Sequence, residues 1–564
     1  MRTQRARDCI ERLTRKKNER SSMNHLWEEV AEVLAPERRG FISKSQPGRN
    51  EQIYDNSPIL AKRGLVNAIG SMLRPKSSAP AKWFDIVPVD EDLLDDPEVK
   101  AWVDRAEDIL WRHIYNPDAF FAHATGEIDD DLVTFGTAAG YVGLRPDMTG
   151  LLFKSFHLKQ VYLDVDALNQ VTGVYITEDL SPRQAADLFG ETHLGVKTLE
   201  RLRSPHKAQR DEKSEYVWRV TRRHERNPLI GNNLNMAYSS LIIDVDSEHE
   251  VAETGYEEMP FFIPRWDTRM SGSTSEWGRG PGILALPSVL SLNQMGKTML
   301  RALHRAVDPP WLLPSDSMVN APQLRPGGVS YYDAKAIRNL GLAKPFQQMD
   351  SAAQIPWGLN AQTAEREIIM AVFFKNILNL PLDAPAMTAT EVIERRESFI
   401  REIGAVFGRL ESSYTNPMVE RAFNILLRKG AFGPPQSIPE VLQGTDVQFR
   451  FASPVEKAKR QIEEAGVNMA MDRVLQIGQM HPEIMNRFNL DAYGKFMAKS
   501  NDFPIDLLRT DEEVAAAVEA QAQAAAAEQQ MQMAERMAPI AAAVPADAEI
   551  PEEALAGAGA PIAA

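Results

Sequence analysis

PGILALPSVLSLNQMGKTMLRALHRAVDPP, residues 281–310, carries the clearest structural signal in this chain of 564 residues. Its apolar side chains recur every three or four residues, which is the period of one face of an α-helix. They are Leu286, Val289, Leu292, Met295, Met299, Leu303 and Val307. Asp308, Pro309 and Pro310 end the pattern, because proline lacks the N–H donor that a helix interior needs. The sequence therefore predicts one long amphipathic helix from Ile283 to Val307.

Downstream, this helix is followed by an insert and two further helices. The insert runs from Asp308 to Pro356, is rich in Pro and Gly, and contains short β-like runs. A second helix is expected from Asn360 to Leu380, and a short loop, 381–387, leads into a third. Thr388 and Glu391 have the spacing of a capping box, so the third helix should begin there.

The third helix should break or kink near Asn416-Pro417, because proline disfavours helical geometry at the residue before it. Helix should then resume through Leu427, and a short strand is expected at 447–451. The chain becomes helical again to about Phe496. Residues 511–537, rich in Ala, Glu, Gln and Met, favour a helix with little core-forming bulk. The Ala-, Pro- and Gly-rich end is expected to be disordered.

Upstream, a helical part precedes a β-rich part. Helices are expected up to Pro36, at 57–73 and at 97–115, where Trp102 and Trp111 should be core residues. From Gly136 to about Pro264, Gly, Pro, Asn and Asp punctuate short β-rich runs, which predicts a small β domain. The runs are 139–145, 161–164, 171–177, 216–222 and 241–245. One helix is expected within this domain, near 181–189, with Ser181 as its cap and Pro182 in its first turn. The fold class is α+β and mainly helical.

Composition limits the function classes. The chain is 44% hydrophobic and 25% charged, which suits several folded units. It has no apolar run near the roughly 20 residues of a bilayer span, and no signal-peptide h-region follows its basic start. We therefore expect a soluble protein of a cytosol or a virion. Cys9 is the only cysteine, which excludes an intramolecular disulfide and a zinc site of several thiolates. The net charge of −15 argues against tight clamping of nucleic acid.

Apparent catalytic motifs are weak. Gly296-Lys297-Thr298 resembles the end of a phosphate-binding loop, but the glycine required five residues earlier is Ser291, and the match lies in a helix. Two acidic pairs, Asp164/Asp166 and Asp244/Asp246, could hold a hard cation, although aspartates at strand ends more often form turns. Residues 129–131, three consecutive aspartates, are interpreted as a solvated helix face.

Other enzyme signatures are missing from the sequence. It contains neither an H-x-x-x-H pair nor a Gly-x-Ser-x-Gly elbow. We therefore expect no enzyme activity, no cofactor and no metal site. What remains is a basic pattern, Lys297, Arg301 and Arg305, whose spacing of four places three cations on one helix face beside His304. An ordinary solvated face explains this pattern equally well.

Four segments together resemble the head-to-tail connector, or portal, family of short-tailed (podovirus, T7-like) bacteriophages. One is Tyr54 to Phe84, with its Ser-Met-Leu-Arg-Pro at 71–75 and Trp-Phe at 83–84. The others are EWGRGPGILALPSVLSLNQ at 276–294, MTATEVIER at 387–395 and FASPVEKAKR at 451–460. Each is modest alone, but their order and spacing are similar to those of the family across much of the chain.

The resemblance implies a ring, usually of twelve subunits, with wing, stem, clip and crown. Residues 1–135 would be the helical part of the wing, 136–270 its β-rich domain, 271–307 a turn and the first stem helix, 308–357 the clip, 358–380 the second stem helix, 381–387 the tunnel loop, 388–450 the long wing helix and following segment, 451–510 the crown, 511–543 a barrel or tail helix, and 544–564 a disordered tail.

The implied function is a channel at one capsid vertex through which double-stranded DNA is packaged and later ejected. Candidate channel residues are Lys297, Arg301, Arg305, Pro381, Leu382, Asp383 and Pro385, and Thr388 and Glu391 cap the wing helix. Implied partners are copies of the chain, DNA, a terminase large subunit, major capsid and scaffolding proteins, a tail adaptor or tail tube protein, and internal core proteins at the crown; no membrane is implied. The implied location is the virion, with assembly in the host cytoplasm. Alternatives are a tail or scaffold protein without a channel, and a packaging ATPase or nuclease.

Overall fold

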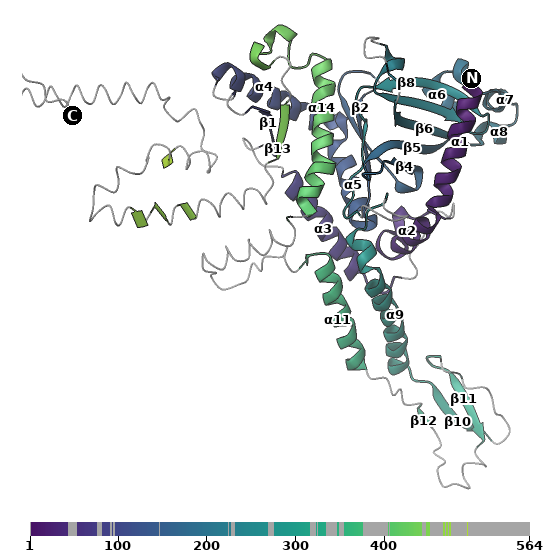
Figure 1. The fold of residues 1–564 in the computed structure, drawn as a ribbon. Coiled ribbons are helices and arrows are strands. Elements are labelled where there is room, and N and C mark those ends of the chain that lie inside the picture. Colours follow the sequence, from purple (N-terminus) through teal and green to yellow (C-terminus); the bar gives the residue numbers. More distant parts are fainter. Residues whose placement is uncertain are drawn as a thin grey trace, which may run out of the picture. The chain divides into compact units, whose positions relative to one another are not determined.

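The computed structural model describes residues 2–42, 53–75, 82–90, 93, 96–145, 147–223, 225–226, 232–268, 276–315, 323, 325–333, 347–348, 355–375, 404, 406–442, 447–451 and eight positions between 466 and 494. The chain divides into two compact units, residues 1–458 and 459–564, and every element named below belongs to the first. This unit mixes helix and strand, with more helix than strand (Figure 1). None of the described helices combines the length and the apolar character that a membrane span requires.

Five helices form most of the first part of the chain. They are α1 (Arg2–Glu19), α2 (Ser21–Leu34), α3 (Ser57–Leu73), α4 (Pro97–Ile114) and α5 (Phe121–Phe135). The predicted helices at 57–73 and 97–115 are confirmed. Asp96 caps α4 by accepting from the Glu98 N–H, and Pro97 occupies the first turn, where its missing N–H costs nothing. Trp102 is buried and Trp111 packs at the edge of the same core, as expected.

A five-stranded antiparallel sheet follows, with its strands in chain order. They are β4 (Val161–Val165), β5 (Val171–Leu180), β6 (Ser214–Arg222), β7 (Tyr238–Asp244) and β8 (His249–Tyr256). All four predicted β runs in this stretch are strands. Helix α1 covers one face, where Ala6, Cys9 and Leu13 bury against Tyr175, Val217 and Ile243. Side chains alternate between the faces, and Val174 and Val220 point into the main core.

Three short helices are inserted between β5 and β6: α6 (Pro182–Phe189), α7 (Val196–Arg203) and α8 (Lys207–Asp211). The predicted cap of α6 is confirmed, because the Ser181 side chain accepts from the Gln184 N–H while the Gln184 side chain accepts from the Ser181 N–H. A small cluster, Ala185, Leu194, Tyr216 and Val251, joins these helices to the sheet.

Two smaller sheets complete the body of the protein, by which we mean α1–α8 and the sheets packed with them. β2 (Ala139–Leu144) pairs with both β3 (Leu151–Phe156) and β9 (Phe261–Phe262), so the run predicted at 139–145 is confirmed. β1 (Phe84–Pro88) pairs antiparallel with β13 (Val447–Phe451), with Phe84 opposite Phe451. The strand at 447–451 was expected, but its partner far upstream was not.

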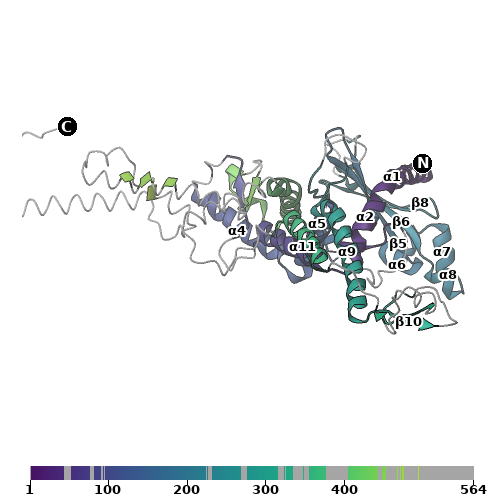
Figure 2. The ribbon, with the colours of Figure 1, turned by 90° about the horizontal axis from the view of Figure 1, so that it is seen from below.

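Helix α9 (Pro281–Val307) confirms the predicted long helix, and its chain continues into the insert. There β10 (Trp311–Ser315) pairs with β11 (Val329–Asp333) and with β12 (Gln347–Gln348). Helix α11 (Ile355–Val372) then returns alongside α9 (Figures 1 and 2). It begins five residues before the expected start at Asn360, because Pro356 lies in its first turn rather than ending the insert.

The third predicted helix is described from Val406 onward. A π-helical turn (Glu411–Thr415) precedes α14 (Asn416–Arg428). The break expected at Asn416-Pro417 is thus a widened turn within a continuous helical segment. Hydroxyls accommodate the altered backbone: Ser412 and Ser413 donate to the Arg409 carbonyl, and Thr415 donates to the Glu411 carbonyl. Pro417 donates no N–H of its own, which fits a change of hydrogen-bond register just before it.

Candidate functional site

The turn that leads into α9 lies against the end of α5. Gly136 ends α5 with φ at 82°, and a side chain on it would overlap with the backbone of Arg279 and Gly280. A side chain on Gly282 would overlap with the Thr134 backbone in the same way. Glycine is needed here because the two backbones approach too closely for a Cβ atom. The Gly-Arg-Gly-Pro-Gly of residues 278–282 therefore sets how α9 leaves the body.

Helices α9 and α11 are antiparallel and closely packed. Near the start of α11, a side chain on Gly358 would overlap with the end of Met299, which lies late in α9. Further along α11, Arg366 binds Asp55, while Asn293, earlier in α9, binds the neighbouring Tyr54. A late residue of α9 therefore lies beside an early residue of α11, and an earlier residue of α9 lies near a later residue of α11, as antiparallel helices require.

Residues 54–55 connect both helices to the body. The Tyr54 N–H donates to Asn293 Oδ1 at 2.8 Å, and Arg366 Nη2 donates to Asp55 Oδ2 at 2.7 Å. Burial acts to raise the pKa of Asp55, but hydrogen bonds from Ser57 and Arg366 outweigh it and hold the pKa below its ordinary value. Asp55 is therefore ionised at neutral pH and forms a charged bridge to α11.

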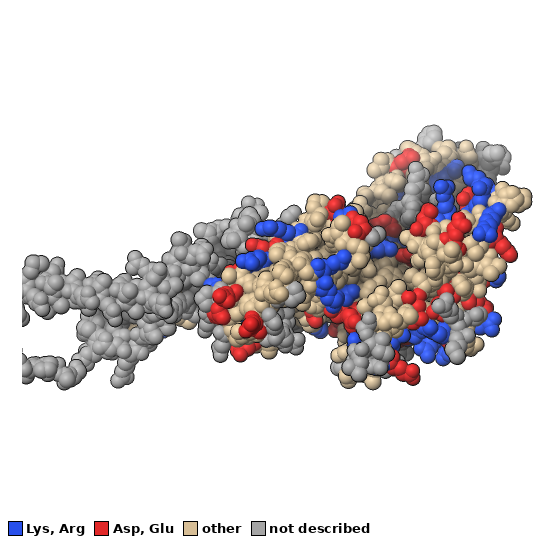
Figure 3. Space-filling model, turned by 90° about the horizontal axis from the view of Figure 1, so that it is seen from above, with Lys and Arg blue, Asp and Glu red and all other residues tan. Residues whose placement is uncertain are grey.

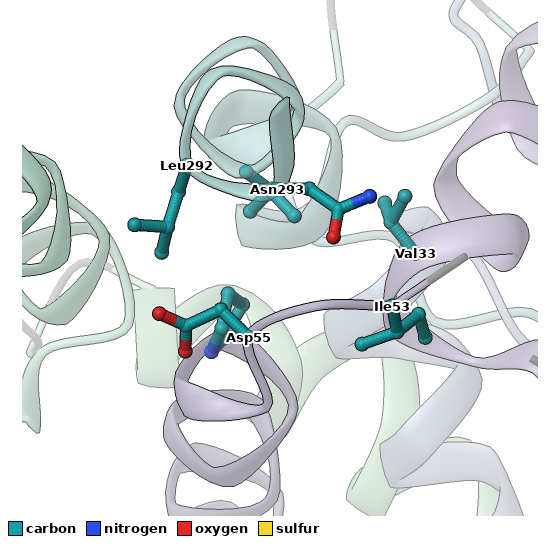
Figure 4. A pocket seen from close by; sticks show the side chains of 7 residues that line it. Val33, Ile53, Asp55, Leu292 and Asn293 are labelled. Atoms are coloured by element: carbon teal, nitrogen blue, oxygen red, sulfur yellow. The ribbon is translucent and has the colours of Figure 1, made fainter. Parts of the chain in front are cut away.

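Figure 4 shows a hollow at this junction, between α2, residues 53–58 and α9. The hollow leaves essentially no space for even a water-sized molecule. Its two polar side chains, Asp55 and Asn293, already bind Arg366 and the Tyr54 backbone. We assign the hollow to packing rather than to ligand binding. Its lining residues are Val33, Ile53, Asp55, Pro58, Val289, Leu292 and Asn293.

The basic residues predicted on α9 lie on the side away from α11. Taking about 100° per residue, Lys297 and Arg301 each point roughly 160° from Met299, which contacts α11. Arg305 points roughly 120° from it. Arg301 and Arg305 are exposed, and Lys297 is half-buried with Nζ 5.9 Å from the centre of the Tyr54 ring. Within the described residues, no carboxylate pairs with any of the three.

Asp129, Asp130 and Asp131 are not the solvated face that the sequence suggested. Asp129 and Asp131 are buried, and Asp130 is partly buried. Each lies beside a cation that is distant in the sequence: Asp129 binds Arg74, Asp130 Oδ1 lies 2.8 Å from Lys62 Nζ, and Asp131 Oδ1 lies 3.2 Å from Arg38 Nε. The expectation was wrong because charges enter a core when each has a partner, and the partners lie far away in the sequence.

Tyr414 of the π-helical turn joins the same cluster. Its side chain is fully buried, and its hydroxyl lies 3.1 Å from Asp129 Oδ1. Its ring stacks on Phe262 at 5.6 Å between centres, and the Arg74 guanidinium lies 5.0 Å from it. The helix that contains residue 414 is thereby fastened to α3 and α5. Sequence patterns gave no indication of this contact.

The motifs that resembled catalytic sites have structural roles. Residues 296–298 lie within α9, so they do not form a phosphate-binding turn. Asp164 accepts from the Tyr175 hydroxyl, and Asp166 accepts from the Leu168 and Gln170 N–H groups in a turn. Asp244 accepts from Thr198. Among the described residues, no three His, Cys, Asp or Glu side chains are arranged to hold a metal.

The remaining predicted site residues cannot be placed. Pro381, Leu382, Asp383 and Pro385 of the loop, and the capping pair Thr388 and Glu391, lie outside the described residues. The segment from 451 to 510 falls almost wholly outside them as well.

Comparison with known proteins identifies the family. The chain belongs to the bacteriophage head to tail connecting protein family, whose model matches residues 6–508. It is similar to the portal protein of Salmonella phage epsilon15, with 24% identity over 499 residues that cover 86% of this chain and 85% of that protein. It is also similar to a probable portal protein of Bordetella phage BPP-1, with 24% identity over 511 residues and 88% coverage of both. The predicted identity, a portal or head-to-tail connector protein, is confirmed.

The comparisons also point to a role in structure rather than catalysis. The family description and both relatives' names denote head-to-tail connectors or portals, which are structural components of the phage capsid. A packaging ATPase or nuclease is therefore not favoured.

Proposed function

We propose that copies of this chain form a closed ring of about twelve subunits, a number typical of this family, at one vertex of the capsid. Double-stranded DNA would enter through the bore during packaging and leave through it during ejection. Family membership and the two portal relatives support this proposal. Electron microscopy and native mass measurement of the purified protein test it, since a stable monomer without annular particles would contradict it.

Each part of the chain has a place in this scheme. Helices α9 and α11 form the stem, and the β10–β12 sheet belongs to the clip, which would meet the terminase and later the tail adaptor. Residues 1–270 and 388–450 form the wing, which would meet capsid and scaffolding proteins. Residues 451–510 form a crown inside the head, where internal core proteins would bind. ATP hydrolysis is supplied by the separate terminase large subunit.

One observation carries the DNA-channel proposal. Lys297, Arg301 and Arg305 lie on one side of α9, away from α11, with no carboxylate partner among the described residues. Many cations elsewhere in that part of the chain are paired, as α1 illustrates through Arg5 with Glu253 and Lys16 with Glu276. Unpaired cations on one helix face suit transient contact with phosphate groups.

The overall charge suits a conduit that guides DNA without holding it. Each phosphate neutralised by Lys or Arg strengthens binding through counterion release. Twelve copies would carry 12 × −15 = −180 formally, so most of the ring repels DNA. On the face seen in Figure 3, acidic and basic side chains are interspersed rather than gathered into one basic field. Three basic residues per subunit then form narrow rings of weak attraction.

Charge reversal tests the role of these residues. We expect Lys297→Glu/Arg301→Glu/Arg305→Glu to assemble into rings but to package DNA several-fold more slowly, with the largest defect at low salt. The matched control is Lys207→Glu/Arg210→Glu/Lys213→Glu, which makes the same charge change at exposed sites in and just after α8. Equal packaging by both variants would show that the α9 residues do not contact DNA.

A second element of the channel would be the tunnel loop, residues 381–387. Pro381 and Pro385 restrict its backbone, and Asp383 is its only charge, so it suits steric narrowing better than phosphate binding. It would narrow the bore and resist backward movement of DNA. Deletion of residues 382–386 should leave packaging possible but lower the fraction of genome retained. Unchanged retention in DNase-protection assays would contradict this role.

A further inference from the structure

Two apolar stripes on the helix pair have no cover within the described chain. The first continues the buried face of α9. Leu286, Val289 and Leu292 are buried against the body. Toward the C-terminal end of α9, beyond its contact with residues 54–55, the same face carries Leu300, Leu303 and Val307, which are 44%, 40% and 84% exposed. A stripe that is core in one half of a helix is thus open to solvent in the other half.

The second stripe lies on α11. Trp357, Ala361, Ala364 and Ile368 recur at spacings of four, three and four, which places them on one face. All four are exposed, Trp357 by 74% and Ile368 by 51%. The two alanines between larger residues leave room for a neighbouring helix to approach. The charged residues of α11, Glu365, Arg366 and Glu367, lie outside this face.

The two stripes point to opposite sides of the pair. At about 100° per residue, Leu303, Val307 and Leu300 lie roughly 40° to 100° clockwise from Met299, viewed down α9. On α11, the stripe from Trp357 to Ile368 lies roughly 60° to 120° from Gly358, and also clockwise from that viewpoint, because the helices are antiparallel. Met299 and Gly358 face each other, so rotations in the same sense direct the stripes apart.

We propose that the α11 stripe of one copy docks against the α9 stripe of the next copy. This inference rests on the ring proposed above and names its contact between helix pairs. A ring of identical chains needs two different, complementary faces on opposite flanks of each subunit, and the stripes satisfy that requirement. Trp357 would be the main anchor, since a large aromatic side chain that becomes buried contributes strongly to an interface.

The arrangement also orients the basic residues of α9. Lys297 and Arg301 point away from α11, roughly at right angles to the line that joins the two stripes, whereas Arg305 turns toward the flank of the α11 stripe. If the stripes meet neighbours around the ring, then Lys297 and Arg301 point along its radius. Bore-facing cations and stripe-mediated contacts are therefore compatible in one orientation of the subunit.

Cysteine cross-linking tests the contact directly. Leu300 and Trp357 both adjoin the Met299–Gly358 contact, so they lie at the same height on opposite flanks. Cys9 can stay, because it is buried and burial raises its pKa to about 11, which keeps the thiol protonated and unreactive. We expect Leu300→Cys/Trp357→Cys or Leu303→Cys/Trp357→Cys to give a ladder of covalent oligomers on oxidation. Single variants and Arg301→Cys/Trp357→Cys should give none.

A substitution supplies an independent measurement. Trp357→Asp should keep the melting temperature of the isolated chain but reduce ring formation at least tenfold in native mass spectra. Leu188→Asp on α6, a comparably exposed apolar residue at 64%, should form rings normally. The interface alone would be overturned if the wild-type chain forms rings, the double-cysteine variants give no ladder, and Trp357→Asp also forms normal rings. Absence of rings from the wild-type chain would instead overturn the proposed ring.

Discussion

Arg366 donates two hydrogen bonds to a single oxygen of Asp55, from Nε at 3.0 Å and from Nη2 at 2.7 Å to Oδ2. The bond joins α11 to a segment 311 positions earlier in the chain. The neighbouring Tyr54 N–H binds Asn293 of α9. Two adjacent residues therefore fix both helices of the pair to the body.

We predict that Arg366→Met lowers the free energy of unfolding by about 1–2 kcal/mol, because it leaves the mostly buried Asp55 carboxylate without its charged partner. The control is Arg409→Met, which removes an exposed pair with Asp267 at 3.5 Å and should change stability by less than about 0.5 kcal/mol. Urea unfolding followed by tryptophan fluorescence measures both. Equal effects would mean that the Asp55 bridge is no stronger than a surface pair.

Glu107 predicts a pH dependence of stability. It accepts from the Ile86 N–H at 2.8 Å, and burial raises its pKa from 4.5 to about 7, although Lys82 and the hydrogen bond oppose the shift. The folded state therefore binds more protons at Glu107 than the unfolded state between these values, so the contribution of Glu107 to stability is greatest below pH 4.5 and is lost as pH rises to 7. Glu107→Gln should remove this fall, which is of order 1–3 kcal/mol. Melting curves from pH 4.5 to 8 test it, and Glu98→Gln, exposed on α4, should keep the wild-type slope.

Tyr414→Phe should destabilise the protein by about 1–3 kcal/mol, because Asp129 Oδ1 loses a buried hydrogen-bond donor while the ring remains. Tyr54→Phe is the matched change at a partly exposed ring and should be close to neutral. Denaturant midpoints compare the two. Indistinguishable midpoints would mean that the Tyr414 hydroxyl contributes nothing to the attachment of its helix.

Gly282→Ala should be severely destabilising, by more than about 3 kcal/mol, because its Cβ would overlap with the backbone of Thr134, which has no room to move. Gly64→Ala in α3 meets nothing within 4 Å and should stabilise the protein by about 0.5–1 kcal/mol through helix propensity. Soluble yield and melting temperature distinguish them. A well-folded Gly282→Ala chain would contradict the close approach of the two backbones.

Sequence periodicity predicted the local elements well. The α9 helix, the α6 cap at Ser181 and the strands of the five-stranded sheet depend on nearby residues, so their patterns are visible in the sequence. Lys297, Arg301 and Arg305 were likewise predicted to share a face by spacing alone. What they touch could not be predicted in this way.

Ion pairs between residues far apart in the chain could not be predicted from the sequence. Asp131 looks like a surface residue until Arg38 is placed beside it, and nothing local marks Arg74 as the partner of Asp129. The turn before Pro417 shows the same limit in the backbone, because a kink was predictable while a π-helical turn bearing a buried Tyr414 was not. Such contacts depend on three-dimensional proximity that periodicity does not encode.

The pairing of Phe84 with Phe451 joins two strands that are synthesised at very different times. Residues 84–88 are translated early, yet their strand partner emerges only after most of the chain has been made. Until then the strand that contains Phe84 lacks its partner, and an open strand edge beside apolar side chains favours aggregation. This sheet can therefore close only after residue 451 has been synthesised, so the chain folds upstream of that point with β1 unpaired.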